Sequence, residues 1–340
     1  MKNEKIKYFS MFTGVGGFEL GIENARTDSS LQRGWNKTTP STESVQGHRN
    51  NSSTPEFKCI GFSEIDKYAS QLLTKRFPDI PNFGDCTKIQ ADTLPDFDIL
   101  CGGFPCQSFS IAGKRRGFQD TRGTMFFHIA RILEVKRPKL VFLENVKGLL
   151  NHNKGETFKV ILQTLEELGY EIQWMVLNSK FFGVPQNRER VFIIGSLRGT
   201  SRPEILPFRT DDTETLKQHS NEVSNTITSR YWKQGNADTY VKTRTTAGTS
   251  QAFRIREVEG VSVTLQGSAG GTGAKTGLYA IDRMRIRRLT PTECERLQGF
   301  PDGWTEGFSD TQRYKMMGNA VTVNVIKAIM SKLTIRKEAT

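Results

Sequence analysis

Cysteine is scarce in this sequence, and its spacing excludes two common uses of the residue. The chain of 340 residues has five cysteines, an odd number, and no two of them form a Cys-x-x-Cys pair. This pattern supports neither a disulfide framework nor a zinc site, so we expect no bound metal and a reducing, cytoplasmic setting. The five residues are Cys59, Cys86, Cys101, Cys106 and Cys294.

Long apolar runs are absent, and acidic residues are outnumbered. No stretch approaches the roughly 20 residues of a membrane-spanning helix, and the N-terminal Met1–Lys5 lacks the apolar core of a signal peptide. There are 36 acidic and 48 basic residues, which gives a net charge of +12. This charge suggests a polyanionic partner, most simply nucleic acid, although charge alone is equally compatible with a merely soluble basic protein. We therefore expect no membrane association.

The first half of the chain alternates between strand-like and helix-like segments, which is typical of an α/β fold. Lys7–Phe12 has a strand-like pattern, and a helix is expected to begin at Phe18 after a glycine-rich turn. The dinucleotide fingerprint Gly-x-Gly-x-x-Gly is not met, because Glu19 occupies its sixth position. A carboxylate aimed at the ligand pocket would repel a pyrophosphate and tolerate a ligand with a positive centre. An ordinary glycine-rich turn is the alternative.

Two further acidic residues follow strand-like segments. Lys58–Ser63 predicts a second strand that ends at Glu64, the place where such folds bind the hydroxyls of a ribose. Asp85 follows another short extended piece and is suited to accept a hydrogen bond from an adenine amino group. Each carboxylate alone is more often a solvated surface group. Together with the glycine-rich turn they predict a pocket for an adenosine that lacks phosphates.

A third strand-like segment ends at the tetrapeptide Phe104-Pro105-Cys106-Gln107. Pro105 fixes its own φ angle, so the next side chain is presented in one direction. A thiolate at the carboxyl end of a strand is placed to act as a nucleophile, although this segment taken alone favours a buried structural cysteine.

The motifs taken together resemble the DNA (cytosine-5)-methyltransferase family of the bacterial and phage type II restriction–modification systems. The resemblance implies S-adenosyl-L-methionine as the cofactor. The matches occur in family order and cover most of the chain: 12–17 (Phe-Thr-Gly-Val-Gly-Gly), Glu64, 84–85, 103–107, 144–146 (Glu-Asn-Val), 186–190 (Gln-Asn-Arg-Glu-Arg), 288–294, 298–301 and 318–321. The cofactor-binding residues that it implies are Phe12, Gly14, Gly16, Gly17, Glu64, Ile65, Asp85, Pro105, Asn319 and Val321.

The same resemblance assigns the catalytic groups. Cys106 adds to carbon 6 of cytosine, which makes carbon 5 nucleophilic. The addition places electron density on ring nitrogen 3, where Glu144 supplies a proton, and a carboxyl group in an apolar, water-poor pocket can stay protonated for this task. Arg190, and with it Arg188, orients the base through its carbonyl oxygen.

The expected nucleic-acid partner is double-stranded DNA, from which the target base must be flipped out. Residues 108–122 are expected to form a mobile loop that closes over the base, although a solvated basic loop is the alternative. Arg254 is suited to read guanine or to contact a phosphate. The predicted DNA contacts are Ser108, Lys114, Arg115, Gln251, Arg254 and Thr264.

The predicted fold is α/β, with the mostly parallel, Rossmann-like sheet of an S-adenosylmethionine-dependent methyltransferase. We expect strands at 172–177 and 191–194 and helices at 124–136, 157–168 and 321–332. Residues 1–198 and 316–340 are expected to form the catalytic domain, and residues 199–315 an inserted target recognition domain, mostly strands and loops, with its hinge. The polar segment 27–56 predicts a disordered surface insertion.

Two alternatives remain at the level of function. One is an RNA (tRNA) cytosine-5 methyltransferase, although the small domain lacks that branch's Cys-Phe-Thr signature. The other is a catalytically silent DNA-binding relative. The chain is expected to be a monomer, and the resemblance also admits a cognate restriction endonuclease that acts separately.

Overall fold

The computed structural model describes residues 5–27, 57–105, 125–201, 203, 205–208, 255–257, 278–282, 285–287 and 289–335. A six-stranded sheet with the order β2-β1-β3-β4-β6-β5 forms its centre. The first four strands in that order pair in parallel, whereas β6 pairs antiparallel with both of its neighbours, so β6 alone is reversed. The strands are β1 (Ile6–Met11), β2 (Phe57–Ser63), β3 (Ile99–Gly103), β4 (Leu140–Val146), β5 (Tyr170–Asn178) and β6 (Glu189–Leu197).

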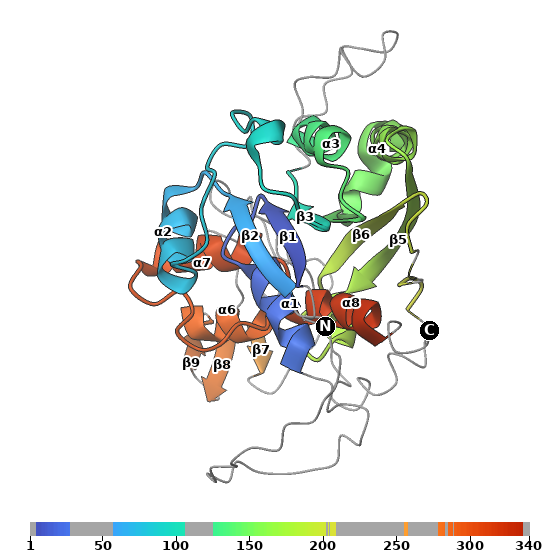
Figure 1. Ribbon diagram of the computed structural model, residues 1–340. Coiled ribbons are helices and arrows are strands. Elements are labelled where there is room, and N and C mark those ends of the chain that lie inside the picture. Colours follow the sequence, from blue (N-terminus) through green and yellow to red (C-terminus); the bar gives the residue numbers. More distant parts are fainter. Residues whose placement is uncertain are drawn as a thin grey trace, which may run out of the picture.

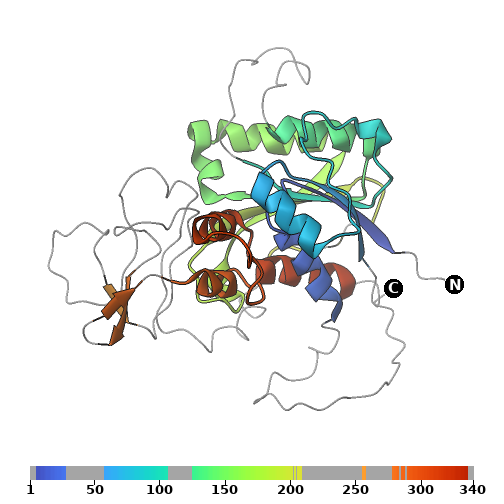
Figure 2. The ribbon, with the colours of Figure 1, turned by 90° about the vertical axis from the view of Figure 1, so that its left-hand side faces the viewer.

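Helices cover both faces of this sheet (Figures 1 and 2). One face carries α3 and α4, and the other carries α1 and α8. Three short 3-10 helices, η1 (Ala91–Thr93), η3 (Lys147–Gly155) and η4 (Ser179–Phe181), lie in the connections. The helices are α1 (Gly17–Thr27), α2 (Lys67–Arg76), α3 (Met125–Lys136), α4 (Glu156–Glu167), α6 (Pro291–Leu297), α7 (Asp310–Asn319) and α8 (Val323–Ile335).

The alternation of side chains along each strand explains why the sheet is covered twice. On β4, Val141 and Leu143 pack into the cluster under α3 and α4, whereas Leu140 and Phe142 pack into the cluster under α1 and α8. Successive residues of a strand point to opposite faces, so a strand with apolar residues at every position must be buried on both sides. The predicted α/β class is confirmed, and five of the six strands run in one direction.

The predicted elements agree closely with the observed ones. The helices predicted at 124–136 and 157–168 are α3 and α4, and the strand predicted at 191–194 is the centre of β6. The C-terminal helix begins two residues later than predicted, because residues 320–322 stay extended before α8. Most of the polar segment 27–56 lies outside the described residues.

The segment that begins at Leu289, whose residues up to 315 were expected in the smaller domain and its hinge, packs against the glycine-rich turn and α2. Leu289, Leu297 and Met317 belong to the same buried cluster as Val15 of the glycine-rich turn and Leu72 of α2. The described residues of 205–208 likewise pack against the α1 and α8 layer. A separate three-stranded sheet remains, with β8 between β7 and β9. Its strands are β7 (Ile255–Glu257), β8 (Leu278–Asp282) and β9 (Arg285–Arg287).

Candidate active site

The carboxyl ends of β1, β2, β3 and β4 meet at one edge of the sheet, because these four strands are parallel. Ligands of open α/β sheets bind outside this edge. The glycine-rich turn follows β1 there, Glu64 follows β2, Phe104 follows β3, and Glu144 lies near the end of β4. The predicted cofactor and catalytic residues that are described therefore lie along this edge and the segments packed against it.

The glycine-rich turn is shaped by close packing on one side and open space on the other. A Cβ atom added at Gly16 would lie 2.7 Å from the Phe77 ring, and one added at Gly17 would lie 2.7 Å from Cγ1 of Val321. Gly14 has a φ of +60° and nothing within 4 Å of its Cβ position. The turn therefore leaves open space at Gly14, where a ligand can approach the backbone closely.

Glu64 ties the end of β2 to this turn. Its Oε2 accepts a hydrogen bond from the Gly14 N–H at 2.7 Å, and its Oε1 accepts one from the Asp66 N–H at 2.7 Å. Burial raises the pKa of Glu64, and these backbone N–H groups oppose the increase. Carboxylate oxygens have several acceptor sites each, so both oxygens can still accept from the hydroxyls of a ribose.

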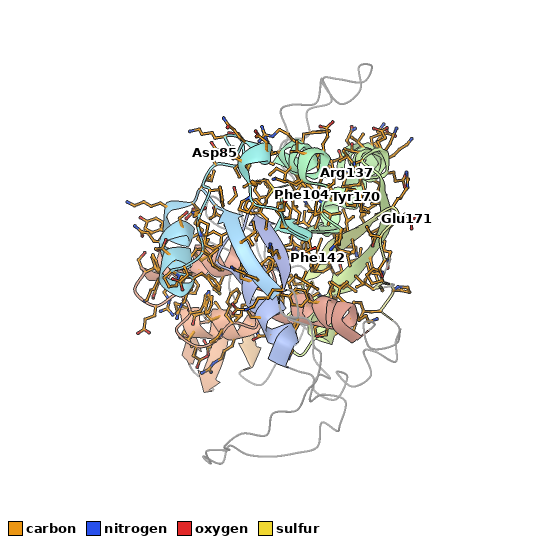
Figure 3. The ribbon with its side chains drawn as sticks, in the orientation of Figure 1. Asp85, Phe104, Arg137, Phe142, Tyr170 and Glu171 are labelled. Carbon is orange, nitrogen blue, oxygen red and sulfur yellow. The ribbon has the colours of Figure 1, made fainter. Side chains whose placement is uncertain are left out.

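Ile65 and Asp85 flank Glu64 with an apolar and a charged surface. The Ile65 side chain is 74% exposed, which is unusual for so large an aliphatic residue. Asp85 lies on the loop beside α3 (Figure 3), and its Oδ1 accepts hydrogen bonds from the N–H and hydroxyl of Thr87. These bonds lower the pKa of Asp85. An exposed apolar side chain and two carboxylates along this edge suit an adenosine, and the negative charge disfavours a phosphate.

Glu19 does not belong to this pocket. Its side chain is fully buried beneath the sheet, with neither carboxyl oxygen in hydrogen-bond geometry with any described group. Burial raises the pKa of Glu19 to about 7. The expectation that this acid is aimed at the ligand pocket is therefore wrong, because the residue lies on the side of α1 that packs on the sheet.

Glu144 and Arg190 form a buried ion pair at the same edge. The Arg190 Nε lies 3.0 Å from the Glu144 Oε1, across the antiparallel pairing of β4 with β6. Gly103 of β3 is the neighbour on the other side, and a Cβ atom there would lie 3.0 Å from the Glu144 Oε2. Burial lowers the pKa of Arg190, whereas Glu144 opposes the decrease. The surroundings of Glu144 are thus charged, in contrast to the apolar pocket that the sequence suggested.

Arg188 points away from an expected base contact. Its Nη2 donates to the Ala320 carbonyl at 2.8 Å and to the Gly318 carbonyl at 3.3 Å. Its Nε and Nη1 are buried and have no hydrogen-bond partner among the described residues. Burial, with the nearby Arg190 charge, lowers the pKa of Arg188. The residue therefore joins β6 to the segment that carries Asn319, whose own side chain is exposed.

The end of β3 is held in place just before residue 106. The Phe104 carbonyl accepts a hydrogen bond from the Asn145 Nδ2 at 2.8 Å, and the Phe104 ring lies 5.6 Å from the Phe126 ring of α3 (Figure 3). Pro105 follows and is exposed. Cys106, Ser108, Lys114, Arg115, Gln251, Arg254 and Thr264 lie outside the described residues.

Sequence reasoning assigned no role to Asn145 or Gln298. Asn145 belongs to the matched Glu-Asn-Val triplet, so the triplet was the available signal. Gln298 donates to the Met317 carbonyl at 2.8 Å and accepts from the Thr322 hydroxyl at 2.9 Å. The Thr322 hydroxyl in turn lies 2.8 Å from that of Ser179. This buried network joins α6, α7 and η4 behind the site.

No group of three or more His, Cys, Asp or Glu side chains is placed to hold a metal ion in the part of the chain that the structure describes. Its four described cysteines are free thiols. None of the described helices is both long and apolar enough to cross a membrane.

The chain is similar to known proteins over almost its whole length. The family model of the C-5 cytosine-specific DNA methylases matches residues 6–334. The chain is 34% identical to the type II methyltransferase M.HhaI of Haemophilus parahaemolyticus, over 95% of this chain and 93% of that protein. It is 36% identical to the type II methyltransferase M.HpaII of Haemophilus parainfluenzae, over 97% and 89% of the two chains.

Solved structures show the same fold. The Dnmt2 methyltransferase of S. pombe superposes with a TM-score of 0.65 at 16% identity, covering 99% of this chain and 100% of that one. A DNMT2 mutant of Spodoptera frugiperda gives a TM-score of 0.64 at 16% identity, over 97% and 99% of the two chains.

The fold and the site define an α/β methyltransferase with a paired acid and arginine at the carboxyl edge of its sheet. The chain belongs to the C-5 cytosine-specific DNA methylase family, and it is therefore a DNA (cytosine-5)-methyltransferase.

Proposed function

We propose that this enzyme transfers a methyl group from S-adenosyl-L-methionine to carbon 5 of a flipped-out cytosine within a specific double-stranded DNA sequence. The observation that carries the proposal is the buried Glu144–Arg190 ion pair. This pair lies beside Gly103, the last residue of β3, which precedes Pro105 and Cys106 by two and three residues. The bound cofactor supplies an electrophilic methyl group on a positively charged sulfur.

The geometry of the edge supports the proposed cofactor-binding residues. Glu64 accepts from the ribose hydroxyls with oxygens that already hold the Gly14 and Asp66 N–H groups. Ile65 offers its exposed side chain to the adenine ring, and Asp85 has one carboxyl oxygen left for the adenine amino group. The phosphate groups of a nucleotide would find no cationic partner among these residues. This agrees with a methyl donor that carries no phosphate.

The chain's own groups perform the steps at the base. The Cys106 thiolate forms a bond to carbon 6, and Glu144 holds the proton at ring nitrogen 3, where negative charge develops. Arg190 uses its Nε for Glu144 and its Nη1 for the Glu189 carbonyl. A guanidinium has five N–H groups, so Arg190 can also donate to the carbonyl oxygen of the base. Once carbon 5 carries the methyl group, it loses its proton to a base or to water, and the bond between carbon 6 and Cys106 breaks to release the thiolate.

Replacing Cys106 with serine tests this assignment. The variant should lose methylation of duplex DNA below detection and keep its affinity for S-adenosyl-L-methionine, because a hydroxyl is a far weaker nucleophile than a thiolate. Incorporation of radiolabelled methyl groups and calorimetric titration of the cofactor measure the two properties. Near-normal turnover in the serine variant would assign the nucleophile elsewhere.

Two experiments distinguish the proposed function from a silent DNA-binding relative and from an RNA methyltransferase. The wild-type enzyme should form a covalent adduct with duplex DNA that contains 5-fluorocytosine, and it should methylate duplex DNA in preference to tRNA. A silent DNA-binding relative would form no adduct. The RNA alternative is not favoured, since the matching family model is that of DNA methylases.

The packing also revises the domain boundaries that we propose. Residues 289–335 join the catalytic domain, and the target recognition domain falls between about residues 209 and 288. Ser108, Lys114, Arg115, Gln251, Arg254 and Thr264 remain the proposed DNA contacts. A monomeric state, a separate restriction endonuclease and a cytoplasmic location stay predictions of the sequence.

A further inference from the structure

The indole of Trp304 is hydrogen-bonded to the backbone of the glycine-rich turn. Its Nε1–H donates to the Val15 carbonyl at 2.9 Å, in a hydrogen bond that spans 289 positions of the sequence. The Trp304 side chain is 7% exposed and lies in the loop between α6 and α7. Val15 stands between Gly14 and Gly16, so this bond fixes the central peptide of the turn.

The loop that carries Trp304 is itself held by a buried carboxylate. Glu295 of α6 is fully buried. Its Oε2 accepts from the Gly303 N–H at 2.7 Å, and its Oε1 accepts from the Thr305 N–H at 2.8 Å. The Arg313 guanidinium pairs with the same Oε1 at 3.1 Å. Charge-assisted bonds to the residues on both sides of Trp304 leave its backbone little freedom.

Arg76 of α2 packs over the face of the indole ring. Its guanidinium carbon lies 4.6 Å from the centre of the Trp304 ring, within the range of a cation–π interaction. Its Nε donates to the Trp304 carbonyl at 3.0 Å, and its Nη2 donates to the Gly303 carbonyl at 2.6 Å. The indole is therefore oriented by α2 as well as by α6.

The neighbours of Trp304 fill the spaces beside the two packed glycines. The Phe77 ring, 6.1 Å from the Trp304 ring, occupies the space next to Gly16. The Phe300 ring, 5.5 Å from the Trp304 ring, reaches 3.4 Å from the Cβ position of Gly17. Trp304 and its two aromatic neighbours thus contact three consecutive residues of the turn, 15–17. The hydrogen bond from Trp304 orients the backbone of the accessible Gly14 toward the ligand side.

We propose that Trp304 is a positioning residue for the cofactor: its indole N–H sets the conformation of the turn at Gly14–Gly17 and thereby the affinity for S-adenosyl-L-methionine. This inference rests on the proposed function. Trp304 does not touch the reacting atoms, so its effect belongs in cofactor affinity and not in turnover at saturating cofactor.

The test is Trp304→Phe, which keeps an aromatic ring and removes the N–H donor. The variant should bind S-adenosyl-L-methionine and S-adenosylhomocysteine more weakly by roughly five- to tenfold, as the loss of one buried hydrogen bond allows. Calorimetric titration without DNA measures both constants. The kcat at saturating cofactor and the KM for DNA should stay close to wild type.

Tyr314→Phe is the matched control. The Tyr314 hydroxyl donates to the Leu289 carbonyl at 2.6 Å within the same buried cluster, and Leu289 lies outside the turn. Both variants lose one buried bond from an aromatic side chain to a carbonyl, so their melting temperatures should fall by similar amounts, yet only Trp304→Phe should lose cofactor affinity.

A second variant, Arg76→Met, leaves the indole in place and removes its cation and carbonyl contacts. It should weaken cofactor binding in the same direction and by less. Equal affinity of wild type, Trp304→Phe and Arg76→Met would overturn the inference, as would equal weakening in Tyr314→Phe. A wild-type protein that binds neither ligand would instead overturn the proposed function.

Discussion

Glu19 carries the clearest consequence at the scale of a single residue. Its carboxyl group is buried among ionisable groups of three strands, Tyr8, Cys59 and Cys101, and the pKa of each is raised by burial, so each stays neutral. Burial likewise raises the pKa of Glu19 from 4.5 to about 7, with small contributions from Glu23 and Glu64. The folded protein therefore binds this proton more tightly than the unfolded chain.

The stability of the protein should consequently fall as the pH rises through this window. Between the unfolded pKa of 4.5 and the folded pKa of about 7, the folded state holds more protons, so the free energy of unfolding decreases with pH and levels off above 7. Glu19→Gln removes the ionisation. Urea unfolding should show a gain over wild type of up to roughly 3 kcal/mol at pH 8 relative to pH 5. Parallel pH dependences in the two proteins would contradict the assignment.

At this scale the sequence predicted the chemistry of the site better than its geometry. The Glu-Asn-Val triplet and the paired arginines predicted Glu144 and Arg190 as catalytic groups through the family resemblance, and the structure places the two side chains in contact. Their 3.0 Å contact depends on the pairing of Val146 with Arg190 between β4 and β6, which no local pattern specifies. The side chain of Arg188 donates to the carbonyls of Gly318 and Ala320, which lie 130 and 132 positions away in the sequence. The spacing of residues within a motif cannot predict such a contact.

The packing of α1 against the C-terminal segment decides the next prediction, at the scale of elements. A Cβ atom at Gly17 would lie 2.7 Å from Cγ1 of Val321 and 3.0 Å from its carbonyl oxygen. The backbone oxygen cannot rotate away, so Gly17→Ala should cost about 1–3 kcal/mol of stability and weaken cofactor binding.

Chemical unfolding and cofactor titration measure these two effects of Gly17→Ala. Gly148→Ala is the control, since the nearest atom to its Cβ position, Cγ2 of Val146, lies 4.0 Å away. Adding Val321→Ala to Gly17→Ala should restore part of the stability by removing Cγ1. A Gly17→Ala protein as stable as Gly148→Ala would show that α1 and α8 can separate freely.

Elements with strong periodicity were predictable, and their relative directions were not. Helices α3 and α4 repeat apolar residues at helical spacing, so their bounds agree within one residue. The reversal of β6 follows from the ten-residue connection after β5, which is shorter than a parallel crossover requires. Trp304 escaped notice because its partner Val15 is 289 positions away.

At the scale of the whole molecule, the position of the insertion after α1 matters. Phe57, the first residue of β2, pairs with Ile6, the first residue of β1. The chain therefore re-enters the sheet after this segment at its amino edge, where Phe57 lies about 20 Å along β2 from Glu64. Catalytic groups gather at the opposite edge.

Deleting residues 28–56 and inserting a short turn should therefore leave methylation of duplex DNA close to the wild-type rate. Steady-state assays with matched protein concentrations measure this, and circular dichroism verifies that the deletant is folded. A deletant with native secondary structure and severely reduced turnover would assign the insertion a direct part in catalysis or DNA binding.

The hydrogen bond from Trp304 to Val15 has a consequence for protein synthesis. The turn at residues 14–17 is translated long before the groups that pack against it, Phe300, Trp304 and Val321. A nascent polypeptide therefore holds this turn without its packing partners until those residues have been made. The cofactor affinity that we propose for the turn requires that these later helices have folded back onto it.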